Sequence, residues 1–291
     1  MKTSKQISLV HPGYAEYAYR WDYYMRSYMG AEEYRDGAYL RKYIAEDQSP
    51  GDQYQQRLLD TALQNHVRQT VDAYRSFLFR NPPSRTLGQL SEDPFVADFI
   101  ENADLDNTTL NDFMREVNDM VTIYGGAWVG VDRPSYQVET VAQEIEEGIR
   151  SYLTLYAPTN VRNWSYSRKV NGQKVLDMVQ IVDEQYHDHD VIRVWHPEVI
   201  EVYKVAKGRS EYSGSALSVT ASVKDTLAID YGEILEYDEY PNPLGYVPFV
   251  HVQTDKSFHK GIGTSAVGDV CDLQREIYNL TSELYQTIRR Q

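Results

Sequence analysis

The chain of 291 residues has one cysteine, few basic side chains and no long apolar run. The single thiol, Cys271, excludes an intrachain disulfide framework and any zinc site built from several thiolates. No stretch approaches the roughly 18 consecutive apolar residues of a membrane-spanning helix. The segment after Met1 also lacks the apolar centre of a secretory signal. We therefore expect a soluble protein of a reducing compartment that has no membrane partner.

Positive charge is scarce, and it is spread unevenly along the chain. Lys and Arg number 29 against 43 Asp and Glu, which gives a net charge of −14. Residues 1–80 carry a net charge of +1 and residues 81–291 one of −15. An acidic surface repels phosphate, so this chain is a poor candidate for a protein that grips nucleic acid by neutralising its backbone.

Phenylalanine is scarce as well, with 7 residues beside 25 tyrosines, and 11 of the tyrosines lie in residues 1–80. Tyrosine buries a ring while its hydroxyl stays available to water or to a partner, so this excess suits a chain with extensive contact surface. A compositional preference of the lineage is the alternative. We expect residues 1–80 to form a helical, near-neutral contact region.

The spacing of apolar residues predicts an α+β fold with a helical N-terminal half and an antiparallel β meander in the second half. One long helix is expected from Asp52 to about Arg80. Residues 81–155 are expected to form helices plus a strand, and residues 156–260 to be rich in β-strands. Asn171-Gly172 is the clearest hairpin turn. Two further expected elements are a helix over 138–152 and a strand over 217–223.

Residues 261–291 form a separate unit, with a final helix predicted from Thr264 or Ser265 to Gln291. Helical spacing continues to the last residue without a glycine, a proline or another stop signal, so we expect this chain to be the front portion of a longer protein. The inward face of this helix should pack on neighbouring protein. It comprises Val267, Val270, Cys271, Gln274, Ile277, Tyr278 and Leu284.

Several short motifs invite a chemical interpretation, and a structural one is favoured for each. His187-Asp188-His189-Asp190 resembles a metal cluster, but it lies between two strand patterns and is expected to be a hairpin loop whose replacement by alanine costs little stability. Gly261–Gly268 lacks the Lys-Ser/Thr of a phosphate-binding loop and is expected to lead into a capped helix. The acidic runs favour solvated faces; they are Glu144, Glu146 and Glu147, then Glu236, Asp238 and Glu239. We therefore predict no enzymatic activity, no cofactor and no metal.

The order of a further set of segments resembles a known family. These segments are Tyr19-Arg20-Trp21, Gly37–Leu40, Tyr54–Leu58, Phe79–Pro83, Tyr124–Pro134, Asn163-Trp164, Asn242–Phe249 and Gln274–Ser282. Together they resemble tailed-bacteriophage portal proteins, in the group whose domain was long described as of unknown function. The likeness covers nearly the whole chain. It departs at Arg41-Lys42, where the group often has a Pro-Lys pair.

The resemblance implies a ring, usually of twelve subunits, at one vertex of the virion capsid, assembled in the host cytoplasm. Double-stranded DNA would pass through the ring during packaging and ejection without sequence-specific binding. The implied partners are the major capsid protein, the large terminase subunit and a head–tail adaptor. Residues 1–260 would correspond to the wing and residues 261–291 to the start of the stem helix. The clip, the returning stem helix and the crown are not in this sequence.

Two sets of residues are candidates for function within such a ring. Acids that could face the channel and keep DNA sliding are Asp269, Asp272, Glu276 and Glu283. Aromatic residues that could form the subunit interface are Tyr14, Tyr17, Trp21, Tyr24, Tyr28 and Tyr39. Two other functions stay open. One is a glycan-acting hydrolase with paired carboxylates, and the other is a monomeric α+β adaptor.

Overall fold

The computed structural model describes residues 2–47, 52–134, 143, 147–208, 231–255 and 260–289. The predicted α+β class is confirmed: a helical N-terminal part precedes an antiparallel β meander and a C-terminal helix. The helices are α1 (Ser4–Ile7), α2 (Pro12–Met29), α3 (Ala31–Tyr34), α4 (Ile44–Asp47), α5 (Asp52–Asp60), α6 (His66–Leu78), the 3-10 helix η1 (Gly88–Glu92), α7 (Pro94–Glu101), α8 (Leu110–Tyr124) and α10 (Gly268–Arg289). The strands are β1 (Gly126–Asp132), β2 (Tyr152–Tyr156), β3 (Val161–Arg168), β4 (Lys174–Gln185), β5 (His189–Trp195), β6 (Val199–Lys207), β7 (Tyr231–Pro241) and β8 (Phe249–Gln253).

The strands of the described residues form two antiparallel sheets. One has three strands in the order β2-β1-β8, and the other has five in the order β3-β4-β5-β6-β7. Arg193 on β5 joins the sheets, because its guanidinium lies 2.8 Å from Asp132 on β1 and 2.7 Å from Asp183 on β4. Asn171-Gly172 forms the turn between β3 and β4, as predicted, with Gly172 at a φ of 82°.

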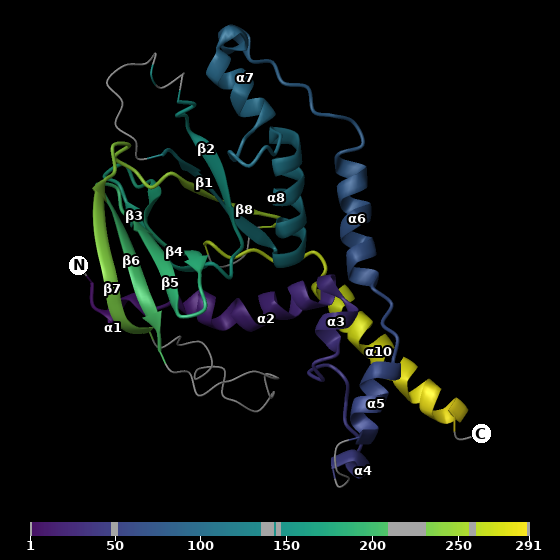
Figure 1. Cartoon of the computed structure of the whole chain (residues 1–291). Helices are drawn as coiled ribbons and strands as arrows, with labels where there is room; N and C mark the ends of the chain where they lie inside the picture. Colours follow the sequence, from purple (N-terminus) through teal and green to yellow (C-terminus); the bar gives the residue numbers. More distant parts are fainter. Residues whose placement is uncertain are drawn as a thin grey trace.

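Helix α2 passes from the five-stranded sheet to the other helices (Figure 1). Pro12 occupies its first turn, where a missing N–H is tolerated, and the side chain of His11 accepts a hydrogen bond from the N–H of Gly13. Tyr14, Ala18 and Trp21 recur on one face and enter the largest core cluster, which also holds Trp128 and Trp164 from the two sheets.

The expected long helix over 52–80 is wrong, because the chain breaks into α5 and α6. Asn65 explains the break. Its Oδ1 accepts a hydrogen bond from the N–H of Arg68 and so caps α6, while its Nδ2 donates to the carbonyl of Tyr28. Tertiary contact with α2 therefore overrides a continuous helical pattern.

Two other predicted elements fall mainly among residues that the structure does not describe. The strand at 217–223 lies outside the described residues, and so does most of the helix at 138–152. The last residue of that predicted helix, Tyr152, begins strand β2 instead.

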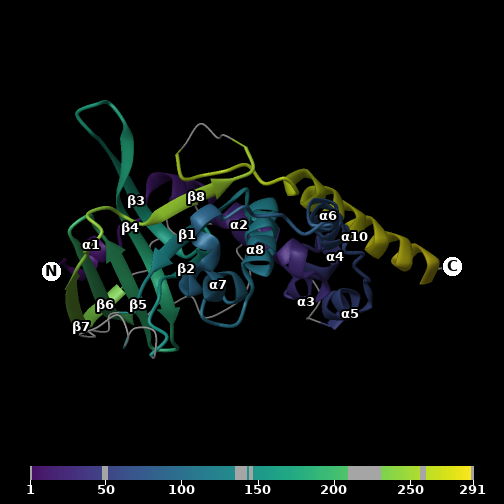
Figure 2. The same ribbon diagram turned by 90° about the horizontal axis from the view of Figure 1, so that it is seen from above.

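Helix α10 begins at Gly268, four residues after Thr264, the earlier of the two predicted starts. The preceding segment is held against the body: Ser265 donates a hydrogen bond from Oγ to the carbonyl of Ile123, and the carbonyl of Thr264 accepts one from Thr254. After these hydrogen bonds α10 extends away from both sheets. The N- and C-termini therefore lie at opposite ends of the molecule (Figures 1 and 2).

Candidate functional site: the three faces of helix α10

The first face of α10 is buried against the N-terminal helices through polar side chains. Gln274, 1% exposed, accepts a hydrogen bond from the N–H of Val67 at 3.0 Å and donates one to the carbonyl of Ser27 at 2.9 Å. One side chain therefore fixes α10 to α6 and to α2. Asn279, one turn further on, accepts from the N–H of Arg41 and donates to the carbonyl of Tyr39.

The middle of α10 is also held by a buried guanidinium. Arg57 on α5 donates to Ser282 Oγ at 3.1 Å, and it pairs with Glu46 at 2.6 Å. Its guanidinium lies over the ring of Tyr43, 4.1 Å from the ring centroid. These bonds satisfy a buried charge and define the position of α10 relative to α5.

The same face contains the only cysteine. Burial raises the pKa of the Cys271 thiol to about 12, so the reactive thiolate is scarce at neutral pH. Cys271 is therefore a packing residue of the core.

The second face of α10 is apolar and exposed. At 100° per residue its side chains fall within a sector of about 80°. They are Leu273, Ile277, Leu280, Leu284 and Ile288, between 38% and 64% exposed. This corrects the predicted inward face: Val267, Cys271, Gln274 and Tyr278 are buried within the chain, whereas Ile277 and Leu284 belong to this exposed stripe. The spacing of three and four residues signals this stripe in the sequence, but it does not separate the stripe from the buried face.

The third face holds the four candidate channel acids. Asp269, Asp272, Glu276 and Glu283 fall within a sector of about 60° on the helix. Two of them are paired within the chain: Asp272 accepts a hydrogen bond from Tyr23 and lies 3.2 Å from Arg275, while Glu276 lies 2.5 Å from Arg41. Among the described residues, Asp269 and Glu283 form no ion pair and both are exposed. They are the free negative charges of this face.

The aromatic side chains of the N-terminal helices are more buried than predicted. Tyr14 and Trp21 are 8% and 1% exposed, so their proposed place in a subunit interface is wrong. The helical period of α2 directs both side chains into the core beside Trp128. Four other candidates are partly buried and keep only part of their surface for a partner. They are Tyr17, Tyr24, Tyr28 and Tyr39.

The segment His187–Asp190 lies at the β4–β5 turn, as predicted. His187 and Asp188 are exposed, but Asp190 is 2% exposed and contacts Lys207 at 3.1 Å and the hydroxyl of Tyr231 at 3.0 Å. The expectation that replacing all four residues costs little stability is therefore wrong for Asp190. In the described part of the chain, no group of three His, Cys, Asp or Glu residues is placed to hold a metal.

The glycines of Gly261–Gly268 provide close packing. A Cβ on Gly263 would lie 1.8 Å from the carbonyl oxygen of Gly125, and one on Gly261 would lie 2.5 Å from Nε1 of Trp164. Neither glycine tolerates a side chain, which supports the structural interpretation of this loop.

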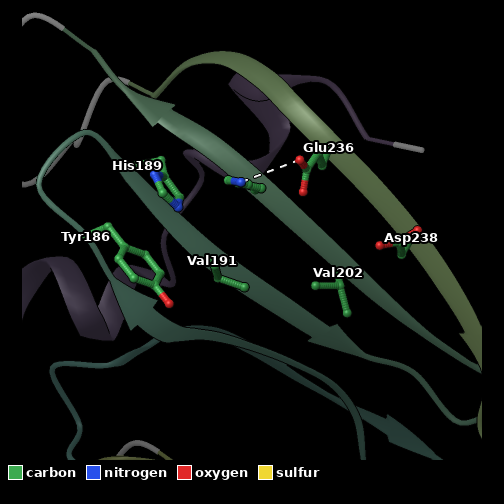
Figure 3. Close-up of a pocket in the computed structure, with 7 residues that line it drawn as sticks. Tyr186, His189, Val191, Val202, Glu236 and Asp238 are labelled. Atoms are coloured by element: carbon green, nitrogen blue, oxygen red, sulfur yellow. Dashed lines mark hydrogen bonds and ion pairs between the residues drawn. The ribbon is translucent and has the colours of Figure 1, made fainter. Parts of the chain in front are cut away.

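The acids of β7 line a shallow pocket on the outer face of the five-stranded sheet (Figure 3). Glu236 and Asp238 come from the same strand and lie beside Lys204, whose Nζ is 3.4 Å from Glu236. A glycosidase needs two carboxylates that flank the scissile bond. Here both acids come from one strand, and Glu236 is held in an ion pair with Lys204.

None of the described helices is long and apolar enough to cross a membrane. No protein-family model matches the chain, and no curated protein sequence matches it either.

Proposed function

We propose that this chain is the wing and the first part of the stem of a ring-forming portal protein, which conducts double-stranded DNA through one vertex of a phage capsid. The order of segments that resembles the portal family suggests this function. The observation that carries it is the division of α10 into a buried, an apolar and an acidic face.

A ring accounts for each of the three faces. The buried face connects α10 to its own subunit through Gln274, Asn279 and Ser282. The apolar stripe from Leu273 to Ile288 is too extended to be favourable in water, and a neighbouring subunit would cover it. The acidic face would then be left toward the central space, where it repels the phosphates of passing DNA.

The acidic chain as a whole supports the same role. A conduit must not bind its cargo, and the net charge of −14 weakens any attraction to the DNA backbone. In this proposal the protein has no enzymatic activity. The large terminase subunit, the major capsid protein and a head–tail adaptor are its partners at the vertex.

Native mass spectrometry and negative-stain imaging of the full-length protein test the proposal. A closed ring is the expected result, and Leu280→Asp on the apolar stripe should prevent ring formation while circular dichroism stays unchanged. Leu244→Asp is the matched control, because Leu244 is 47% exposed but lies far from α10 in the loop after β7. A monomer at every protein concentration would contradict the proposal and leave the adaptor as the better assignment.

A further inference from the structure

The β3–β4 hairpin tip and the β7 edge of the five-stranded sheet carry opposite charge. The β3–β4 hairpin projects beyond the sheet (Figure 2), and residues 168–174 at its tip are all exposed. This tip carries Arg168, Lys169 and Lys174 and no acid. Among the described residues, none of the three basic side chains forms an ion pair. Three free positive charges stand together on a protein whose net charge is −14.

The tip is structurally well defined. Gly172 donates a backbone hydrogen bond to the carbonyl of Lys169 at 2.8 Å, and Asn171 accepts one through Oδ1 from the N–H of Gln173 at 3.0 Å. Val170 is fully exposed between the basic residues. The hairpin therefore presents a fixed basic surface with one apolar side chain at its centre.

Strand β7 forms the opposite edge of the same sheet. It carries four acids and no basic residue; the acids are Glu233, Glu236, Asp238 and Glu239. Only Glu236 is in an ion pair with a described residue, Lys204. Leu235 and Tyr240 on this strand are 49% and 42% exposed. Within the described residues β7 has a neighbouring strand on one side only, and helix α1 also contacts it. An edge strand is a surface on which a partner can dock.

We propose that the β3–β4 hairpin tip of one copy docks on the β7 edge of the next copy. Since β3 and β7 are opposite edges of one sheet, the two surfaces cannot meet within a chain. A contact between two different patches is heterologous and generates a ring when the rotation closes. Charge complementarity aligns the three bases with the unpaired acids, and Val170 meets the exposed apolar side chain of Leu235. The inference rests on the proposed ring and names one of its contacts.

A nucleic acid is the other polyanion that a basic hairpin could meet. A second copy of the chain is the better partner, because its β7 edge provides the matching acids. The net negative charge of the rest of the protein repels the phosphates of a nucleic acid. Residues 168–174 also contain no aromatic side chain on which a base could stack.

Charge reversal in the full-length protein tests the contact. One variant combines Arg168→Glu, Lys169→Glu and Lys174→Glu, and a second combines Glu233→Lys, Asp238→Lys and Glu239→Lys. Each alone should raise the protein concentration needed for half-maximal assembly by about tenfold or more, and the two sets together in one chain should restore it. The matched control for the first variant, Arg35→Glu with Arg80→Glu and Arg85→Glu, makes the same change of charge at exposed positions outside the sheet and should assemble normally.

Two outcomes would overturn the contact while the portal assignment stands. One is that rings form at an unchanged concentration in both reversed variants. The other is that hairpin reversal abolishes binding of a short DNA duplex, measured by fluorescence anisotropy, without affecting assembly.

A cross-link separates this inference from the proposed function. In a chain carrying Val170→Cys and Leu235→Cys, oxidation should produce a ladder of covalent oligomers, because the two positions lie on opposite edges of the sheet. A ladder without closed rings would support the contact while the portal function fails. Rings without a ladder would overturn the contact alone.

Discussion

The imidazole of His251 lies against the indole of Trp128, with the ring centroids 4.9 Å apart. Burial lowers the pKa of His251 to about 4, from an ordinary value near 6.5. The folded chain therefore keeps this ring neutral at a pH at which the unfolded chain has already protonated it. Stability from this group is fully present above pH 6.5 and is lost as the pH falls toward 4.

We expect the free energy of unfolding to fall by up to about 3 kcal/mol through this group across that pH window. Urea unfolding of the native chain and of His251→Gln at several pH values measures the difference, which should shrink toward pH 4. His187→Gln removes an exposed histidine and is the matched control. An identical pH dependence in the native chain and in His251→Gln would contradict the assignment.

A second prediction concerns the anchor of α10. Gln274→Leu leaves the N–H of Val67 and the carbonyl of Ser27 without their partner, and both residues are fully buried. An unsatisfied buried group costs about 1–3 kcal/mol, so the two groups together should lower the free energy of unfolding by about 2–6 kcal/mol. Chemical denaturation measures it. Gln69→Leu makes the same change at an exposed position of α6 and should alter stability by less than about 0.5 kcal/mol.

A third prediction concerns the β4–β5 turn. It compares the loss of stability caused by replacing Asp190 with the loss caused by replacing Asp188. Asp190→Ala removes the buried carboxylate that faces Tyr231, Lys207 and Arg162. The Arg162 side chain is only 6% exposed, so its charge would be left buried without an acidic partner, which costs about 3–5 kcal/mol. Asp188→Ala changes a side chain that is 79% exposed and should cost less than about 0.5 kcal/mol. Thermal unfolding of the two single variants compares them. Equal melting temperatures would show that Asp190 is not a buried partner.

Local patterns predicted much of the fold, and tertiary contacts decided the rest. The Asn171-Gly172 turn needs only its own backbone preferences, and α8 and the meander follow from periodicity. The break before α6 depends on a bond from Asn65 to Tyr28, 37 residues away, and the start of α10 depends on Ser265 reaching Ile123. No local window contains either partner.

The candidate site shows the same division. A helical period is enough to bring Asp269, Asp272, Glu276 and Glu283 onto one face. The period does not show which apolar face is covered, so it places Ile277 with the buried residues although this side chain is 38% exposed. The high tyrosine content of residues 1–80 does not distinguish interior from surface either, so it predicts an interface position for Trp21, which is buried.

The last prediction concerns the acidic face of α10 and rests on the proposed function. Asp269 and Glu283 are the free acids of that face, whereas Asp272 and Glu276 are paired with Arg275 and Arg41. Asp269→Lys with Glu283→Lys changes each subunit by about four charges and leaves the pairs intact. Each phosphate that becomes paired adds an attraction that weakens with salt, so DNA should stall in the mutant channel at low salt and move again as salt is raised.

A packaging assay with full-length protein measures this effect. Glu16→Lys with Glu92→Lys is the matched control, because it makes the same change of charge at exposed positions outside α10. Imaging must first show intact rings for both variants, since a failure to assemble would also stop packaging. Intact rings that translocate DNA at the native rate in low salt would show that these two acids do not face the DNA. The acidic face of α10 would then have to meet another protein at the vertex.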